Sequence, residues 1–218
     1  MFTTPDGGLT AAGYVLSVAV LLAALGAAAV ISSHRKDKKP FSTRRLVFCA
    51  VAIALAYIAS YIKLVHLPFG GSITLFSMLF IVLVGNWYGT AVGLLVGFAY
   101  GLLQFLQNPY VLSLLQVCLD YLFAFAALGL SGVFCNKKHG LIKGYILGVA
   151  ARGFFSSLAG YAFWMEYMPE NFPKSISMLY PVVYNFGFMA AEGIVTVLVI
   201  MIPAVSRALD TVKKLAQG

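Results

Sequence analysis

Long apolar segments, separated by short polar or glycine-containing breaks, make up most of the chain. A helix that crosses the hydrocarbon layer of about 30 Å needs about 20 residues, and most of these segments approach that length. The first segment is not preceded by basic residues, so we expect a retained span and not a cleaved signal. The segments cover residues 10–31, 46–64, 73–86, 90–107, 111–134, 143–164 and 177–205. The pattern therefore predicts an all-α integral membrane protein with seven transmembrane helices.

The composition excludes the common classes of soluble protein. Of the 218 residues, 61% are hydrophobic and only 10% are charged, whereas soluble domains carry about 25% charged residues. Seven spans leave no room for a separate catalytic or nucleotide-binding domain. The net charge of +8 would indicate nucleic-acid binding in a soluble protein. In a membrane protein it reports topology instead, so we expect contact with membrane lipid and none with nucleic acid.

Basic residues gather in three places that seven spans bring to one side of the membrane. They lie in residues 34–45, in the loop 137–143 and in the C-terminal stretch 207–214. Cytoplasmic loops of membrane proteins carry the excess of Lys and Arg. We therefore expect the N-terminus outside and the C-terminus in the cytoplasm.

Small residues line one face of two predicted spans. In the fourth span a glycine recurs every four residues, which lets a neighbouring helix approach closely, so we expect tight packing inside the bundle. Ala50 and Ala54 form a second small-residue face, on the second span, that suits internal packing and contact with another subunit equally. The glycines of the fourth span are Gly89, Gly93, Gly97 and Gly101.

Three charged residues, Asp120, Arg152 and Glu192, lie deep inside predicted spans. Charge is costly there and marks candidate functional sites. Asp120 and Arg152 would neutralise each other in a buried ion pair, which is the structural alternative to a ligand contact. For Glu192, the sequence favours ligand contact and a role in packing or subunit contact equally.

Polar and aromatic residues gather in the outer halves of the last four predicted spans. Such a cluster suits a flat, partly cationic small molecule, because aromatic faces attract positive charge and a carboxylate adds a charge-assisted hydrogen bond. Aromatic residues also mark membrane interfaces, but that tendency does not account for the carboxylate and amides. The cluster contains Tyr100, Gln104, Tyr110, Gln116, Asp120, Tyr121, Ser156, Gly160, Trp164, Tyr180, Tyr184 and Asn185.

The sequence carries no motif for enzymatic chemistry. It has no His-Glu-x-x-His pair, no Gly-x-Ser-x-Gly element and no phosphate-binding loop, and its three cysteines are not spaced as metal ligands. We therefore expect no enzymatic activity, no metal and no cofactor. A solitary proton-coupled carrier that uses Asp120 or Glu192 is an alternative, although no internal repeat of the kind found in such carriers is visible.

Five stretches in the same order resemble a known family. They read LPFGGSITLF, GLLVGFAYGLLQ, YVLSLLQVCLDYLFAFAALGLSGVF, RGFFSSLAGYAFW and SMLYPVVYN. Over residues 44–205 the chain resembles the bacterial thiamine transporters of the energy-coupling factor (ECF) type. The Leu-Asp-Tyr-x-x-Ala-Phe-Ala block and the final Tyr-x-x-x-x-Asn are the most specific parts of the resemblance.

The resemblance implies a six-helix subunit (S component) of the bacterial cell membrane that binds thiamine, vitamin B1. Such subunits have no ATPase activity and work with a transmembrane coupling subunit and two cytoplasmic ATPases. The chain then divides into an extra N-terminal helix with a basic loop (1–43), a six-helix binding domain (44–205) and a basic tail (206–218). Ala50 and Ala54 match the small-residue face that contacts the coupling subunit.

The resemblance also implies roles for individual residues. It gives the acidic ligand contact to Asp120, beside the aromatic Tyr121, and a basic residue is usual at the position of Arg152. Ser156 stands where the family usually has a histidine, a difference that could shift the preference among thiamine, its phosphates and its pyrimidine precursor. An S component for a related ligand, a pyrimidine precursor or another vitamin, is the alternative. The other implied ligand contacts are Tyr100, Tyr110, Gly160, Trp164, Tyr180 and Asn185.

Overall fold

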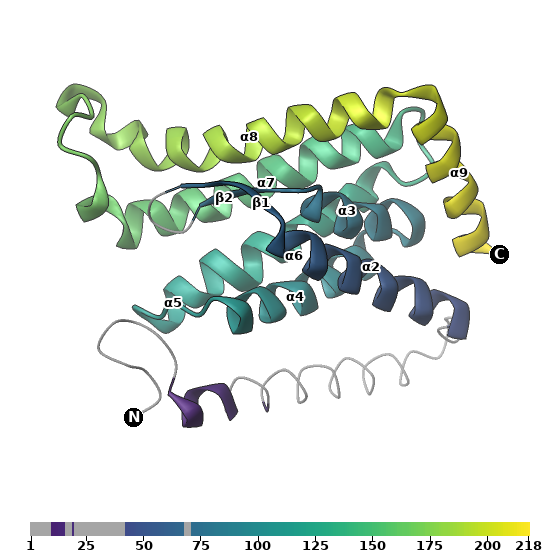
Figure 1. Ribbon diagram of the computed structural model, residues 1–218, viewed down its shortest axis with the longest axis horizontal. Coiled ribbons are helices and arrows are strands. Elements are labelled where there is room, and N and C mark those ends of the chain that lie inside the picture. Colours follow the sequence, from purple (N-terminus) through teal and green to yellow (C-terminus); the bar gives the residue numbers. More distant parts are fainter. Residues whose placement is uncertain (1–9, 16–18, 20–41, 68–70) are drawn as a thin grey trace.

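The computed structural model describes residues 10–15, 19, 42–67 and 71–218, and this part is mostly helical (Figure 1). Of the predicted first span, 10–31, residues 10–15 and 19 are described, and the remainder lies outside the described residues. Among those residues, five helical segments are long and apolar enough to cross a membrane. They are Thr43–Tyr61, Thr90–Gln107, Leu114–Phe134, Gly140–Phe163 and Lys174–Met201.

These segments correspond closely to predicted spans, although two of them are built from several helical pieces. Leu114–Phe134 consists of α5 (Leu114–Val117), the π-helix η2 (Cys118–Phe123), α6 (Ala124–Ala127) and the 3₁₀ helix η3 (Leu128–Phe134). A 3₁₀ turn, η5 (Lys174–Leu179), leads into α8 (Tyr180–Met201). The remaining long helices are α2 (Thr43–Tyr61), α4 (Thr90–Gln107) and α7 (Gly140–Phe163), and a 3₁₀ turn, η4 (Met165–Tyr167), follows α7.

The predicted third span, 73–86, is a short helix preceded by a β-hairpin. Strands β1 (Lys63–His66) and β2 (Ser72–Thr74) pair antiparallel, and α3 (Ser77–Tyr88) follows. Twelve residues of helix rise only about 18 Å, which is too short to cross the hydrocarbon layer. Non-helical backbone at membrane depth must be covered by protein or line a cavity. The all-α prediction therefore omitted a two-stranded sheet that completes this segment.

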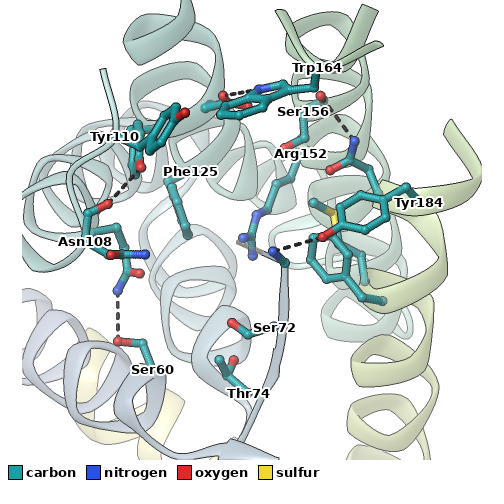
Figure 2. A pocket seen from close by; sticks show the side chains of 18 of the residues that line it. Ser60, Ser72, Thr74, Asn108, Tyr110, Phe125, Arg152, Ser156, Trp164 and Tyr184 are labelled. Atoms are coloured by element: carbon teal, nitrogen blue, oxygen red, sulfur yellow. Dashed lines mark hydrogen bonds between the residues drawn. The ribbon is translucent and has the colours of Figure 1, made fainter. Parts of the chain in front are cut away.

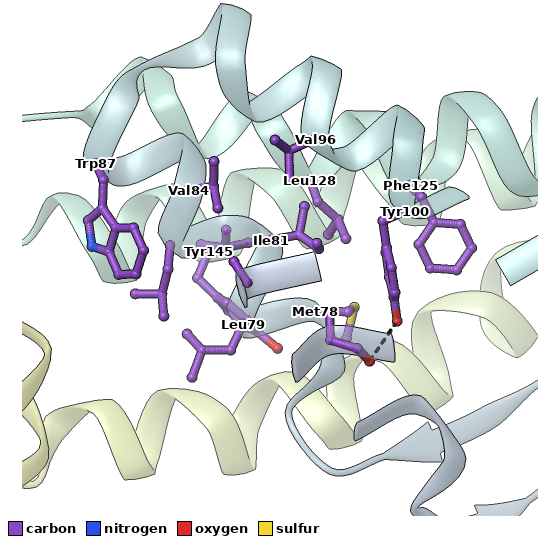
Figure 3. Close-up of a cluster of buried hydrophobic side chains, with 14 of the residues drawn as sticks. Met78, Leu79, Ile81, Val84, Trp87, Val96, Tyr100, Phe125, Leu128 and Tyr145 are labelled. Atoms are coloured by element: carbon purple, nitrogen blue, oxygen red, sulfur yellow. Dashed lines mark hydrogen bonds between the residues drawn. The ribbon is translucent and has the colours of Figure 1, made fainter. Parts of the chain in front are cut away.

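Helix α3 is the centre of the bundle. Its sequence is apolar on all sides, which is typical of a helix surrounded by others. Met78, Ile81, Val82 and Val84 are each at most 1% exposed, and Figure 3 shows the neighbouring side chains from α4, η3 and α7 packed around this helix. This core fixes the helices whose ends form the cavity described below.

Glycines bring α4 against the broken helix Leu114–Phe134. A Cβ atom at Gly93, Gly97 or Gly101 would lie within 3 Å of the backbone of that helix, so the prediction of tight packing is confirmed at these positions. Gly89 is different, because it has open space around it and a φ of 87°. It forms the sharp break between α3 and α4, where a residue with a side chain would be strained.

The last predicted span, 177–205, ends early, at Met201. Pro203 starts a second helix, α9 (Pro203–Gln217), which runs across the end of the bundle at a steep angle to α8 (Figure 1). The hydroxyl of Tyr88 donates a hydrogen bond to the Ala216 carbonyl oxygen, at 2.9 Å. The predicted basic tail, 206–218, is thus helical and is hydrogen-bonded to the end of α3.

Candidate functional site

A cavity of about 480 Å³ opens between the ends of α4, α5–η2, α7 and α8, and the β-hairpin closes one side (Figure 2). Pockets of this size with mostly apolar walls and a few placed polar groups are typical small-molecule sites. All nine residues predicted as ligand contacts line this cavity: Tyr100, Tyr110, Asp120, Tyr121, Ser156, Gly160, Trp164, Tyr180 and Asn185. Their contact with a ligand stays a prediction.

Asp120 is held in place by two donors from different helices. Its Oδ2 atom accepts hydrogen bonds from Gln116 Nε2 at 2.9 Å and from Trp164 Nε1 at 3.1 Å. Gln116 is fully buried and one turn earlier in the same segment. The second oxygen of Asp120, Oδ1, accepts no hydrogen bond from any residue that the structure describes. An oriented carboxylate with one available oxygen therefore lies in the cavity wall.

A π-helix carries this carboxylate. The six residues Cys118–Phe123 form π turns within an otherwise α- and 3₁₀-helical segment. Short π segments inside helices are frequent at functional sites. Here the segment places two consecutive residues, Asp120 and Tyr121, in the wall of the same cavity.

Three aromatic rings, those of Tyr110, Trp164 and Tyr167, cluster beside Asp120 at one end of the cavity. The Tyr110 and Trp164 ring centroids lie 5.1 Å apart, and those of Trp164 and Tyr167 lie 5.3 Å apart. The hydroxyls of Tyr110 and Tyr167 are 3.3 Å apart, and their hydrogen bond raises the pKa of Tyr110. The rings thus offer apolar faces next to the carboxylate, while the hydroxyls are already occupied.

The α7–α8 wall is shaped by close helix contact. Asn185 Nδ2 donates to the Pro181 carbonyl oxygen at 2.9 Å and to the Ser156 carbonyl oxygen at 3.3 Å. A Cβ atom at Gly160 would lie 2.6 Å from the Pro181 Cβ atom. Packing alone therefore requires a glycine at position 160, whether or not it also contacts a ligand.

Two of the predicted tyrosines use their hydroxyls within the protein. Tyr100 is completely buried and donates to the Ala56 carbonyl oxygen at 3.2 Å, and Tyr121 donates to the Asn108 carbonyl oxygen at 2.9 Å. Neither hydroxyl is therefore available to a ligand. Their hydroxyls instead fix the wall against α2 and against the loop that follows α4.

The alternative reading, an ion pair between Asp120 and Arg152, has no counterpart among the contacts of these two side chains in the described part of the chain. The Arg152 guanidinium lies over the Phe125 ring, 4.2 Å from its centroid, and its buried Nε atom has no hydrogen-bond partner among the described residues. The opposite charge that acts on Arg152 is that of Glu192. Along α7, Arg152 lies about three turns before Trp164, the residue that donates to Asp120.

Glu192 connects α8 to the hairpin. Its Oε2 atom accepts hydrogen bonds from the backbone N–H of Thr74 at 2.9 Å and from the Thr74 hydroxyl at 2.8 Å. Tyr184, two turns earlier in α8, accepts a hydrogen bond from the Gly71 N–H at 3.1 Å. The hairpin is thus fastened to α8 at two points, and Glu192 lines the cavity as well.

Sequence reasoning missed the wall formed by the hairpin and by the side of α2. Lys63, Gly71, Ser72 and Thr74 of the hairpin line the cavity. So does Ser60, which accepts a hydrogen bond from Gln104 Nε2 at 2.9 Å. The glycine-rich sequence before Ser72 was the available signal for a hairpin, but strands of four and three residues give too little alternation to recognise.

Chemically, the cavity is equipped to hold an aromatic cation. It combines aromatic rings with two carboxylates at membrane depth, where a cationic group on the ligand would relieve their desolvation. Among the described residues no three His, Cys, Asp or Glu side chains are close enough to hold a metal ion. Aromatic rings beside an oriented carboxylate are groups that suit an organic ligand.

Comparison with known proteins identifies the family of the chain. The profile of the thiamine transporter protein family matches residues 46–211. The thiamine transporter ThiT of Bacillus subtilis is 30% identical over 172 residues, which cover 72% of this chain and 88% of that protein. A solved structure of ThiT from Listeria monocytogenes superimposes with a TM-score of 0.59 at 27% identity, covering 79% of this chain and 96% of the other. On the extent of these matches, the chain is a multi-pass membrane protein that belongs to the thiamine transporter family.

Proposed function

We propose that the chain binds thiamine in this cavity and serves as the substrate-binding subunit of an ATP-driven ECF importer in a bacterial cell membrane. The observation that carries the proposal is Asp120, held by Gln116 and Trp164 in a cavity lined with aromatic rings. Thiamine joins a permanently cationic thiazolium ring to an aminopyrimidine ring. Both rings suit stacking on aromatic side chains, and the cation suits the free oxygen of Asp120.

The rest of the site supports the same ligand. The Tyr110–Trp164 pair gives the cavity a flat aromatic wall beside the carboxylate. Phe188 and Tyr184 contribute further rings from the opposite side, on α8, with centroids 5.8 Å apart. Ser156 is a small neighbour where a bulkier side chain would narrow the cavity. A flat ligand of two linked rings fits between these walls.

The second part of the proposal is assembly with partner subunits. Ala50 and Ala54 are exposed on one face of α2, among the exposed apolar side chains of Val47, Val51 and Ile58. Small residues on an exposed apolar helix face let a helix of another subunit approach closely in lipid. We assign this face to the transmembrane coupling subunit, which would link the chain to two cytoplasmic ATPases. The cavity mouth then faces outside and α9 faces the cytoplasm.

Two experiments test the proposal. Native mass spectrometry of the full chain, purified without added ligand and then incubated with a mixture of vitamins, should show one bound thiamine. Retention of riboflavin or of a thiamine precursor, with no thiamine, would contradict the ligand assignment. In proteoliposomes, uptake of labelled thiamine should require the coupling subunit, the ATPases and ATP. Uptake driven by a proton gradient with the chain alone would favour a solitary carrier.

A further inference from the structure

The cavity has a second charged end that the proposed contacts of Asp120 do not use. Along α7, Arg152 lies 12 residues before Trp164, a rise of about 18 Å. Along α8, Glu192 lies seven residues after Asn185, a rise of about 10 Å. Figure 2 shows Tyr110 and Trp164 at one end of the cavity, Ser72 and Thr74 at the other, and Arg152 reaching between them. We call the part around Arg152, Glu192 and Thr74 the inner end.

The two charges of the inner end are not joined to each other. Glu192 is 5% exposed and uses Oε2 for the two Thr74 donors, while its buried Oε1 has no hydrogen-bond partner among the described residues. The buried Nε atom of Arg152 has none either. Buried polar atoms without a hydrogen-bond partner are costly, so the Oε1 atom of Glu192 and the Nε atom of Arg152 both influence whatever enters this end of the cavity.

Taken alone, Arg152 would favour an anionic group on the ligand. A guanidinium at membrane depth, with an unused donor, attracts phosphate strongly. The carboxylate of Glu192 opposes that attraction, because Glu192 and Arg152 line the same cavity. A neutral hydroxyl is compatible with both charges, since it can donate to a carboxylate and accept from a guanidinium. A phosphate ester can satisfy only the guanidinium.

We propose that Glu192 is a specificity residue, which makes the inner end accept the neutral hydroxyethyl tail of the ligand and exclude phosphorylated tails. The proposal rests on the proposed function, because the free vitamin ends in a primary alcohol and its phosphate esters carry negative charge at that position. Lys63, a half-buried cation on β1, also lines the cavity. The positive charge of Lys63 would attract a phosphate group, whereas the Glu192 carboxylate repels it. Glu192 is therefore the residue of the inner end that disfavours an anionic tail.

The matched variant is Glu192→Gln. Glutamine has the size of glutamate, and its carbonyl oxygen can accept both hydrogen bonds from Thr74, so the hairpin keeps its attachment while the charge is removed. The measurement is the ratio of the dissociation constants of thiamine monophosphate and thiamine, obtained by calorimetry on the full chain in detergent. Glu170→Gln makes the same chemical change at an exposed position that does not line the cavity, and is the control.

In Glu192→Gln, the ratio of the dissociation constant of thiamine monophosphate to that of thiamine should fall by about tenfold or more. This is the effect of removing one like charge from a weakly screened site. In Arg152→Gln, the ratio should shift the other way, and in Glu170→Gln it should not change. A ratio unaltered in Glu192→Gln, with thiamine still bound, would overturn the inference and leave the proposed function intact. If the wild-type chain bound neither ligand, the proposed function itself would fail.

Discussion

The charge of Asp120 should account for much of the affinity for a cationic ligand. The substitution Asp120→Asn removes that charge but keeps an oxygen that accepts from Gln116 Nε2 and Trp164 Nε1, the donors that hold the side chain at 2.9 and 3.1 Å. At 4 Å and an effective dielectric constant of 20, two unit charges attract by about 4 kcal/mol. Part of this is offset by desolvation, so we expect a loss of about 2 to 3 kcal/mol, or roughly 100-fold in Kd.

Calorimetric titration of the full chain in detergent measures this loss. Glu170→Gln, which removes an exposed carboxylate outside the cavity, should bind as the wild type does. A thiamine analogue with a neutral ring in place of the thiazolium separates charge from shape. It should bind the wild-type chain weakly, and Asp120→Asn should lower its affinity far less than that of thiamine. If Asp120→Asn bound thiamine within threefold of the wild type, the carboxylate would not be the partner of the cation.

Three further substitutions test other parts of the account. Gly129→Ala should lower the free energy of unfolding by about 2 to 3 kcal/mol, because the new Cβ atom would lie 2.1 Å from the α4 backbone. Gly187→Ala, which has open space around it, should not lower it, and equal melting temperatures of the two variants would refute the packing argument. Trp164→Phe keeps an aromatic ring but loses the hydrogen bond to Asp120, so the affinity for thiamine should fall about five- to tenfold in a titration. An unchanged Kd would show that this hydrogen bond does not orient the carboxylate. Tyr88→Phe removes the hydrogen bond to the α9 carbonyl and should speed proteolysis within α9 while binding stays unchanged; unaltered cleavage would mean that this bond does not hold the helix.

Hydrophobic patterning predicted the helical bundle because long apolar runs in a membrane chain have few alternatives. It also located the cluster around Asp120 and Trp164, since polar groups inside apolar spans are conspicuous. The hairpin was missed because its polar residues look like an ordinary loop between spans. The π turns at Cys118–Phe123 carry no sequence signal, because they depend on how the helix packs.

Partners of buried charges were the least predictable part of the site. The sequence offered Arg152 as the counter-charge of Asp120, but the structure gives Asp120 two neutral donors. One of them, Gln116, is four residues away and follows from helical spacing. The bond between Glu192 and Thr74 joins residues 118 positions apart. Contacts of this kind are set by tertiary packing, which one sequence does not reveal.

Binding of thiamine itself is the most direct test of the central claim. Trp164 lies in the wall of the cavity, so the intrinsic fluorescence of the purified full chain reports on its occupancy. Titration with thiamine should quench this fluorescence saturably, at one ligand per chain and at micromolar concentration or below. No change in fluorescence on addition of thiamine, in protein shown to be folded by its thermal transition, would contradict the account.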